Sequence, residues 1–397
     1  MAPSIPAARR SADYEQLCRF VGSRYCYFPT KATDWESAVS HYRVPAENAS
    51  TKRTFVRVLE ELLDELYDAH THLTIHLSDS WRLPPHDVWA EWRDGKIVVT
   101  EVRSDSVAAR AGLSVNTEIV GFNGGSIMQR VAARRPHFLL RPDPAAGHWA
   151  LLSALSGRRG QGRELEVRHQ NGARRVLRLP DEATPSPQHP LFVSHIIGAG
   201  IGYIRVSSFQ TVGVVPAFDR VLEAHRASRG LVIDVRNNPG GDTRVTRPIM
   251  GRLVRNRVQY AWMNRRVGAS LGKKWPEYIY SRGRWQYMQP IVILVNHWTM
   301  SAAEGFAMAL EAVGRATVVG TRMAGLGAGV ARTRLKYSGI EAQISAEPVY
   351  HVDGRPRSEF RPEQEVDLTV YSAKQIDPVL ATGLAVLERK LSHTLLN

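Results

Sequence analysis

The stretch that decides the fold is IVILVNHWTMSAAE, residues 291–304. Its short run of apolar, β-branched residues ends at small polar residues and leads at once into an alanine-rich segment. This pattern is typical of a buried strand that delivers the chain into the start of a helix. Ser301 lies at that corner, near the unpaired N–H groups of the helix, where negative charge is favoured. The serine is therefore a candidate nucleophile, although serine also caps helices for purely structural reasons.

The segments on either side of this stretch alternate between strands and helices. Upstream, the sequence predicts a strand at 202–209, a helix at 214–225, a strand at 230–235 that ends in the turn NNPGG (237–241), and a helix at 243–254. Downstream, it predicts strands at 316–320 and about 331–352. Short, nearly continuous apolar strands that alternate with helices indicate an α/β layered core.

The N-terminal region is predicted to be helical and to lead into a pair of histidines. Apolar residues repeat at intervals of three and four from Phe55 to Tyr67, with acidic residues on the other face, as in an amphipathic helix. The period changes at the segment DAHTH, where His70 and His72 lie. Histidine at such a junction is commonly an ordinary polar residue. A serine nucleophile would need a base, however, so both histidines are candidates.

The stretch from about Pro85 to Pro180 has short alternating segments separated by turn residues. It predicts a strand at 95–102, a short helix at 106–113, a strand with an Asn-Gly turn at 118–125, and a hairpin around Asn171-Gly172. The order of "SVAARAGL" and "EIVGFNG" closely resembles a PDZ domain, which implies capture of a peptide by addition of a strand to a sheet edge. The proline-rich residues 181–190 are predicted to be a linker.

Composition and charge indicate which classes of function this protein can have. The 397 residues suffice for two or three domains, and 43% hydrophobic with 23% charged residues is ordinary for a globular chain. The net charge is +14, but the basic residues are scattered, so a solvated basic surface is favoured over a nucleic-acid partner. No ligand-spaced cluster or phosphate-binding loop appears, so neither a metal nor another cofactor is expected.

Targeting signals and cysteines bear on the compartment. No apolar run is long enough to span a membrane, and the first ten residues lack the apolar segment of a secretory signal. We therefore expect a cytoplasmic protein without a membrane span, or a periplasmic or secreted one if the true start lies upstream. Cys18 and Cys26 are expected to be reduced, or to form at most one local disulfide after export.

Two backbone features could together form an oxyanion hole. The turn at Gly240, with Gly241 as a second candidate, would let an N–H approach a substrate carbonyl, and the N–H of Ala302 follows the serine directly. The motifs "GYIRVSSF", "LVIDVRNNPGGD" and "ILVNHWTMSAAE", behind a PDZ-like segment, resemble the S41 peptidases. That resemblance covers about residues 55–370. It implies a ClpP/crotonase-like core, with Ser301 as the acylating nucleophile and Gly240 plus Ala302 as oxyanion donors.

The same resemblance indicates which base would serve the serine. In the tail-specific branch of the family a lysine follows the serine by about two dozen residues, but Leu326 stands at the matching position here. The tricorn-core-like branch uses a histidine in a "DxHT" motif and a later glutamate. This implies a Ser-His-Glu triad with His70 as base and Glu359, 58 residues after Ser301, as its orienting partner. His72 and Glu363 are the alternatives.

The sequence therefore predicts a serine-type peptidase that hydrolyses peptide bonds of peptide or unfolded protein substrates through an acyl-enzyme. Its predicted parts are an N-terminal helical segment (1–84), a PDZ-like domain that presents or gates substrate (85–181) and the peptidase core (190–397). A catalytically inactive peptide-binding protein of the same fold is the alternative, since the family lysine is missing. A homo-oligomer is left open. Nucleic-acid binding driven by charge is a third hypothesis, and it would require affinity that falls steeply with salt.

Overall fold

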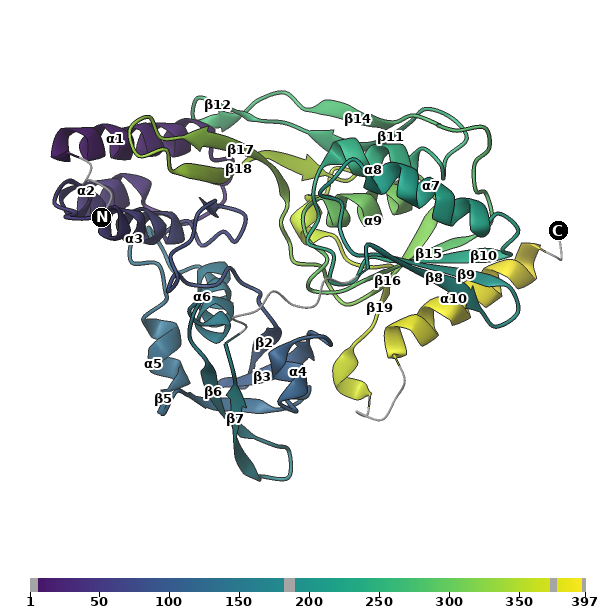
Figure 1. The fold of residues 1–397 in the computed structure, drawn as a ribbon, viewed down its shortest axis with the longest axis horizontal. Helices are drawn as coiled ribbons and strands as arrows, with labels where there is room; N and C mark the ends of the chain where they lie inside the picture. Colours follow the sequence, from purple (N-terminus) through teal and green to yellow (C-terminus); the bar gives the residue numbers. More distant parts are fainter. Residues whose placement is uncertain (1–5, 182–189, 372–376, 395–397) are drawn as a thin grey trace. The chain divides into compact units, whose positions relative to one another are not determined.

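The computed structural model describes residues 6–181, 190–371 and 377–394 (Figure 1). Residues 182–189 of the predicted linker lie outside these ranges. The fold is a mixed α/β structure, which confirms the predicted class. No helix in the described ranges is long and apolar enough to cross a membrane. The chain divides into two compact units: Met1–Thr184, Asn264–Lys273 and Ala328–Glu347 form the first, and Pro185–Met263, Lys274–Gly327 and Pro348–Asn397 form the second.

A six-stranded sheet forms the centre of the second unit. Its strands, in spatial order, are β19 (Gln364–Glu365), β16 (Ala316–Gly320), β15 (Ile291–Val295), β10 (Gly230–Asp234), β9 (Ile201–Val206) and β8 (Phe192–Ile197). The first five are parallel, and β8 pairs antiparallel with β9. Every residue of β10, β15 and β16 is buried. This explains the continuous apolar runs, because a parallel sheet covered on both faces exposes neither side of its strands.

Helices cover both faces of this sheet (Figure 1). On one face lie α7 (Val214–Ala224), α8 (Thr243–Met250) and α9 (Ala302–Ala312), which share a core with the sheet around Phe218, Ile249 and Phe306. On the other face α10 (Pro378–Thr394) packs through residues such as Val379, Val386 and Leu387. Two further strands, β11 (Val258–Met263) and β14 (Trp275–Ile279), pair antiparallel, and β11 also pairs with Val349 and Tyr350 of β18 (Glu341–Tyr350). Short 3₁₀ turns η1 (Arg357–Glu359) and η2 (Leu368–Val370) follow.

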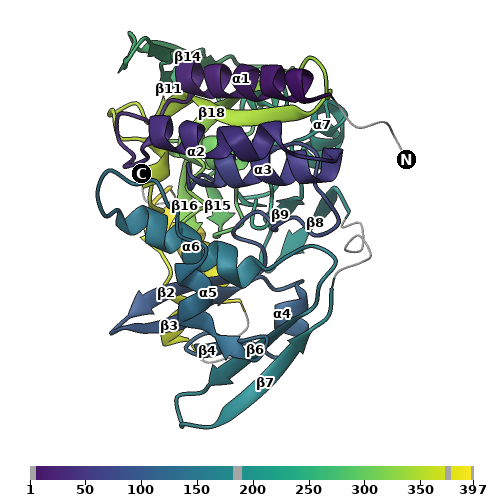
Figure 2. The same cartoon turned by 90° about the vertical axis from the view of Figure 1, so that its left-hand side faces the viewer.

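The first unit begins with three helices, α1 (Ala7–Arg24), α2 (Trp35–Glu47) and α3 (Lys52–Asp64), which lie beside β18 (Figure 2). Their apolar faces share a core with Leu335, Ile340 and Ile344. Within this unit β18 pairs with β17 (Ala328–Arg334) and with the two-residue strand β1 (His72–Leu73), and β12 (Arg266–Val267) pairs with β13 (Ser270–Leu271). Cys18 and Cys26 are buried and free.

The predicted β-rich stretch forms a six-stranded sheet of its own. Its strands are β2 (Val88–Arg93), β3 (Lys96–Val102), β4 (Glu118–Phe122), β5 (Gly125–Ser126), β6 (Arg163–Arg168) and β7 (Arg174–Leu179). Its helices are α4 (Val107–Arg110), α5 (Ile127–Ala132) and α6 (Pro144–Ser156). Strands β3, β4, β6 and β7 and the short helix α4 were predicted, but β2, α5 and α6 were not. Most of α6 is buried, so its sequence lacks the polar face that makes a helix recognisable.

Candidate active site

Ser301 lies where the predicted strand-to-helix corner places it, between β15 and α9. It is the residue immediately before α9, and its backbone has φ 51° and ψ −113°. A residue with a side chain rarely adopts a positive φ, and such strain persists only where the surrounding structure enforces it. The serine is therefore held in an unfavourable conformation at the N-terminus of a buried helix, a place where developing negative charge is stabilised.

Gly240 lies directly against this corner. Its φ is 88°, and a Cβ at this position would lie 2.5 Å from Met300 O, 2.9 Å from Ala302 N and 3.1 Å from the Cβ of Ser301. These distances are far below van der Waals contact, so any side chain at residue 240 would displace the serine loop. The glycine turn and the serine corner, 61 residues apart in sequence, thus pack backbone against backbone.

Three N–H groups at this junction are candidate donors to a substrate oxygen. The N–H of Gly240 donates to Asn238 Oδ1 at 2.8 Å. The N–H of Ala302, at the first position of α9, has no acceptor within the helix. In the described part of the chain the N–H of Gly241 has no acceptor, while the neighbouring Asp242 N–H donates to Phe209 O at 3.0 Å. Ala302 and Gly241 therefore carry the two N–H groups without acceptors.

Glu304, in the first turn of α9, fixes the backbone of Ser301 by a hydrogen bond. Its side chain is fully buried and accepts the Ser301 N–H at 2.6 Å, the Gly325 N–H at 2.8 Å and the Leu326 N–H at 3.0 Å. Burial raises the pKa of this carboxyl, while the Arg357 guanidinium and the three N–H groups act to lower it. Glu304 was not among the site residues predicted from the sequence. The pattern S-x-x-E that starts a helix would have indicated it, because a glutamate at this position typically reaches back to the capping residue.

The structure places residue 326 beside Ser301. The N–H groups of Ser301 and Leu326 donate to the same oxygen of Glu304, so the two backbones are neighbours. The Leu326 carbonyl accepts a hydrogen bond from Arg357. This is where the resemblance would put the lysine of the tail-specific enzymes, and a leucine cannot accept a proton.

The two glutamate candidates follow β18 in the second unit. Glu359 is exposed and ends η1, a turn whose Arg357 contacts Leu326 and approaches Gly305 of α9. Glu363 is also exposed and precedes β19 at the sheet edge. Glu359 is thus on a segment packed beside the serine helix, whereas Glu363 is on one that pairs with β16.

The histidine candidates belong to the first unit, in the loop between α3 and β1. His70 is 8% exposed, its N–H donates to Asp68 Oδ1 at 3.0 Å, and its carbonyl accepts from Gln343 Nε2 at 3.1 Å. His72 Nδ1 is 2.7 Å from the Leu73 carbonyl, and its Nε2 is 3.4 Å from Gln343 Nε2. Burial lowers the pKa of His72, which favours its neutral form.

Asp68 anchors this loop. Besides the His70 N–H, it accepts the Thr71 hydroxyl at 2.8 Å, and Thr71 Oγ1 in turn accepts the Ser345 N–H of β18 at 3.1 Å. Burial acts to raise the pKa of Asp68, but Lys31, His70 and its hydrogen bonds outweigh this and hold the pKa below its usual value. The "DxHT" pattern therefore has a physical basis, since its Asp and Thr tie the loop to β18. No group of three His, Cys, Asp or Glu side chains within the described ranges could hold a metal ion.

Family models match two parts of the chain. Residues 200–366 match peptidase family S41, and residues 6–64 match the tricorn protease C1 domain. The chain carries a peptidase family S41 domain. This confirms the family that the three core motifs predicted, and the second match agrees with the tricorn-core-like branch.

Curated relatives of this chain include both branches of the family. Over 423 residues it is 26% identical to tricorn protease homolog 1 of Streptomyces coelicolor, which covers 98% of this chain and 36% of the relative. Over 237 residues it is 26% identical to the carboxy-terminal processing protease CtpB of Bacillus subtilis, covering 59% of this chain and 45% of the relative. The chain thus spans less than half the length of either relative.

Solved structures share the fold across nearly the whole chain. Mature CPAF complexed with lactacystin has a TM-score of 0.63 at 15% identity and covers 98% of both chains. The photosystem II D1 C-terminal processing protease has a TM-score of 0.56 at 17% identity, covering 90% of this chain and 93% of its own. At these identities the likeness concerns the fold alone.

Proposed function

We propose that this S41 protein is a serine-type peptidase that hydrolyses peptide bonds through an acyl-enzyme on Ser301. The observation that carries the proposal is the junction of Ser301 with Gly240: a strained serine at a helix N-terminus is packed against a glycine turn. Two N–H groups at this junction, those of Ala302 and Gly241, have no acceptor among the described residues. Such an arrangement suits attack on a carbonyl carbon, because the donors are in place before negative charge develops on the oxygen.

The proposed reaction uses His70 as the base. The Ser301 hydroxyl attacks the scissile carbonyl, and its proton passes to the neutral imidazole of His70. When the C–N bond breaks, His70 returns that proton to the leaving amine, which leaves an ester on the serine. Water, deprotonated by the same histidine, then attacks the ester, and His70 gives this proton to the Ser301 oxygen as the acid is released.

The contacts of the alternative candidates, His72 and Glu363, favour His70 as the base and Glu359 as its orienting partner. Both ring nitrogens of His72 already face protein atoms, the Leu73 carbonyl and Gln343 Nε2, so His72 would have to break contacts to act. Glu359 lies on a turn that contacts α9, whereas Glu363 precedes the edge strand β19. For the oxyanion we propose Ala302 and Gly241 as donors. Gly240, whose N–H donates to Asn238, mainly provides the space.

The β2–β7 domain is proposed to act as a PDZ-like domain that presents or gates the peptide. The order of a strand, the short helix α4, a strand with a tight turn and a final hairpin supports this, because PDZ domains bind a peptide as an added strand. The substrates would be peptides or unfolded segments of proteins.

Labelling with a fluorophosphonate tests the proposed function directly, because this probe reacts with an activated serine. We expect labelling of the wild type, none in Ser301→Ala, and labelling slowed at least about 100-fold in His70→Ala. His72→Ala is the matched control on the same loop and should label at close to the wild-type rate. If the folded wild type does not react, the protein is not a serine peptidase of this kind. An inactive peptide-binding protein would then be favoured.

A further inference from the structure

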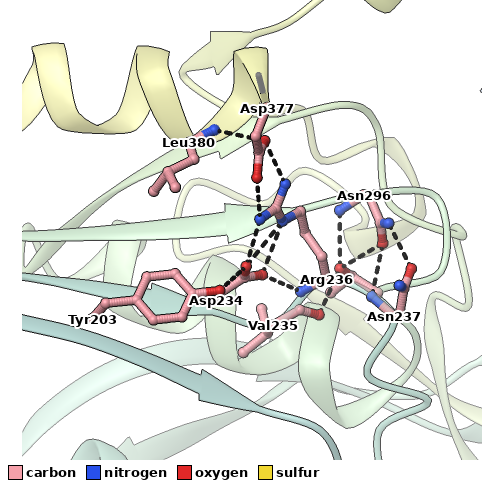
Figure 3. A network of polar contacts seen from close by, with 9 residues as sticks. Tyr203, Asp234, Val235, Arg236, Asn237, Asn296, Asp377 and Leu380 are labelled. Atoms are coloured by element: carbon pink, nitrogen blue, oxygen red, sulfur yellow. Dashed lines mark hydrogen bonds and ion pairs between the residues drawn. The ribbon is translucent and has the colours of Figure 1, made fainter. Parts of the chain in front are cut away.

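An arginine in the second unit, with a side chain that is 19% exposed, lies between two carboxylates from distant parts of the chain (Figure 3). Arg236 follows β10 directly. Its guanidinium donates to Asp377 through Nη1 and Nη2, each at 2.8 Å, and to Asp234 through Nε at 3.0 Å and Nη2 at 2.6 Å. Asp377 immediately precedes α10 and is 141 residues away in sequence. This double bidentate geometry is the strongest arrangement available to an arginine.

The surroundings complete this ion-pair network. Asp234 is 1% exposed and accepts the Tyr203 hydroxyl of β9 at 2.7 Å. Burial acts to lower the pKa of Arg236, but the charges and hydrogen bonds of Asp234 and Asp377 outweigh it and raise the pKa above its ordinary value. The arginine is thus permanently charged, and its position is determined by both carboxylates together.

The network continues directly into the turn that faces Ser301. Asn237, next to Arg236, has a φ of 61°, its N–H donates to Asn296 Oδ1 at 3.0 Å, and its Oδ1 accepts from Asn296 Nδ2 at 2.8 Å (Figure 3). One residue further on, the Asn238 carbonyl accepts the Met300 N–H at 3.0 Å. The segment from Arg236 to Gly240 is therefore joined to the serine loop at successive residues.

Docking of α10 does not by itself require this network. The helix buries Val379, Val386 and Leu387 against Val232, Val292 and Leu294 of the sheet, and burial of apolar surface is the main stabilising contribution to such packing. Buried ion pairs contribute little net stability compared with apolar residues of the same size, but they determine geometry. Arg236 is itself the first residue of the turn at 236–241, so its contact with Asp377 joins that turn to the start of α10.

We propose that Asp377 is a positioning residue for the reaction. Together with Asp234 it fixes Arg236. Through Arg236, the first turn of α10 holds the Gly240-Gly241 turn at the distance from Ser301 that oxyanion binding needs. This inference rests on the proposed function. It makes the C-terminal helix part of the machinery that sets the activity of the site, although none of its residues touches the substrate.

The substitution Asp377→Asn tests this role selectively. Asp377 also accepts the Leu380 N–H at 3.0 Å, and asparagine caps helices as well as aspartate does, so the variant keeps the start of α10 and loses only the charge. The matched control is Asp219→Asn. Asp219 of α7 makes the same bidentate contact with Arg282, at 2.7 Å to each oxygen, and its side chain is 27% exposed against 31% for Asp377.

Labelling, steady-state kinetics and amide hydrogen exchange, all measured on the full chain, decide the outcome. We expect Asp377→Asn to slow fluorophosphonate labelling about tenfold, since a small displacement of catalytic groups costs this much or more, and to lower kcat on a peptide substrate with KM unchanged. Amide hydrogen exchange in peptides covering 236–241 and 296–301 should become faster. Asp219→Asn should leave labelling, kcat and hydrogen exchange in these peptides unchanged. Its melting temperature should shift as much as that of Asp377→Asn.

Equal effects of the two variants on labelling and exchange would show that the Asp377 pair is merely structural. The same conclusion follows if exchange in 236–241 is unaltered in Asp377→Asn. If the wild type does not label at all, the proposed function is wrong, but exchange still decides whether Asp377 holds the turn. The two failures are therefore distinguishable.

Discussion

The loop at Ser301 and the loop at His70 are both well ordered by hydrogen bonds, but by different kinds of group. Around Ser301 the contacts are mostly backbone: Met300 N–H to Asn238 O, and the packing of Gly240 against the serine. The His70 loop depends on a charged centre, Asp68, whose ionised form is stabilised by Lys31 and His70. Neither loop could hold its shape by local sequence alone, since each is tied to segments far away in the chain.

The difference indicates which disturbances each loop tolerates. Backbone contacts do not titrate, so the corner at Ser301 should be more sensitive to added volume than to pH, with the buried Glu304 as its main titratable group. A loop organised by ionised side chains should respond to pH and to changes of charge. The following predictions test this contrast, from the largest expected effect to the smallest.

Gly240→Ala should produce the largest effect. The added methyl group would lie 2.5 Å from Met300 O and 2.9 Å from Ala302 N, so the turn and the serine loop must separate. We expect fluorophosphonate labelling to fall about 1,000-fold, comparable to loss of an oxyanion donor, with a destabilisation of about 3 kcal/mol. Labelling kinetics and urea unfolding measure the two quantities.

Gly314→Ala is the control for this substitution. Gly314 follows α9 with a φ of 66°, and a Cβ there would meet nothing within 4 Å. It therefore carries only the strain of a positive φ, about 1 kcal/mol, and should label at the wild-type rate. Equal loss of labelling in both glycine variants would mean that backbone strain, and not the approach of Gly240 to Ser301, explains the effect.

Glu304→Gln should have an intermediate effect. The amide keeps one acceptor oxygen and brings an NH₂ donor to face N–H groups that the carboxylate now accepts, including those of Ser301 and Leu326. We expect labelling about tenfold slower and a destabilisation of about 2 kcal/mol. Glu223→Gln on α7 is the control, because that side chain is 55% exposed. Unchanged labelling in Glu304→Gln would exclude a positioning role for this carboxylate.

The pH dependence of Lys31 should have the smallest effect on labelling, because it concerns the stability of the other loop. Lys31 Nζ donates to the carbonyls of Leu66 and Tyr67, and burial lowers its pKa from 10.5 to about 8, against the opposing charge of Asp68. Between pH 8 and 10.5 the unfolded chain therefore binds more protons than the folded one. Stability should rise with pH across this window by up to about 1.4 kcal/mol per pH unit.

Urea unfolding at pH 8 to 10.5 measures this dependence in the wild type, in Lys31→Met and in the exposed control Lys96→Met. The slope should be smaller only in Lys31→Met. A slope that is the same in all three proteins would contradict a lowered pKa of Lys31. The rate at which Ser301 is labelled, corrected for the protonation of the proposed base His70, should not change with the stability between pH 8 and 10.5. This holds if the corner at Ser301 is independent of the charge at Asp68.

Much of the second unit could be predicted because its signals are local. The apolar runs at 230–234 and 291–295, the glycines after the first and the serine after the second each indicate an element without knowledge of its neighbours. The buried helix α6 and the helix α10 were missed. The first lacks a polar face, and the network that anchors the second, through Asp377, depends on Arg236 in a different part of the chain.

The sequence by itself determined the strand-to-helix corner at Ser301, the glycine turn at Gly240 and the family, because these depend on residues next to one another. Only the tertiary structure decided how those pieces are held together. The positive φ of Ser301, the three N–H groups gathered by Glu304 and the pairing of Arg236 with Asp377 all involve a geometry or a partner that the local pattern does not specify. Hydrogen bonds and ion pairs between distant residues leave no periodicity in a sequence, so the fold has to form before they can be recognised.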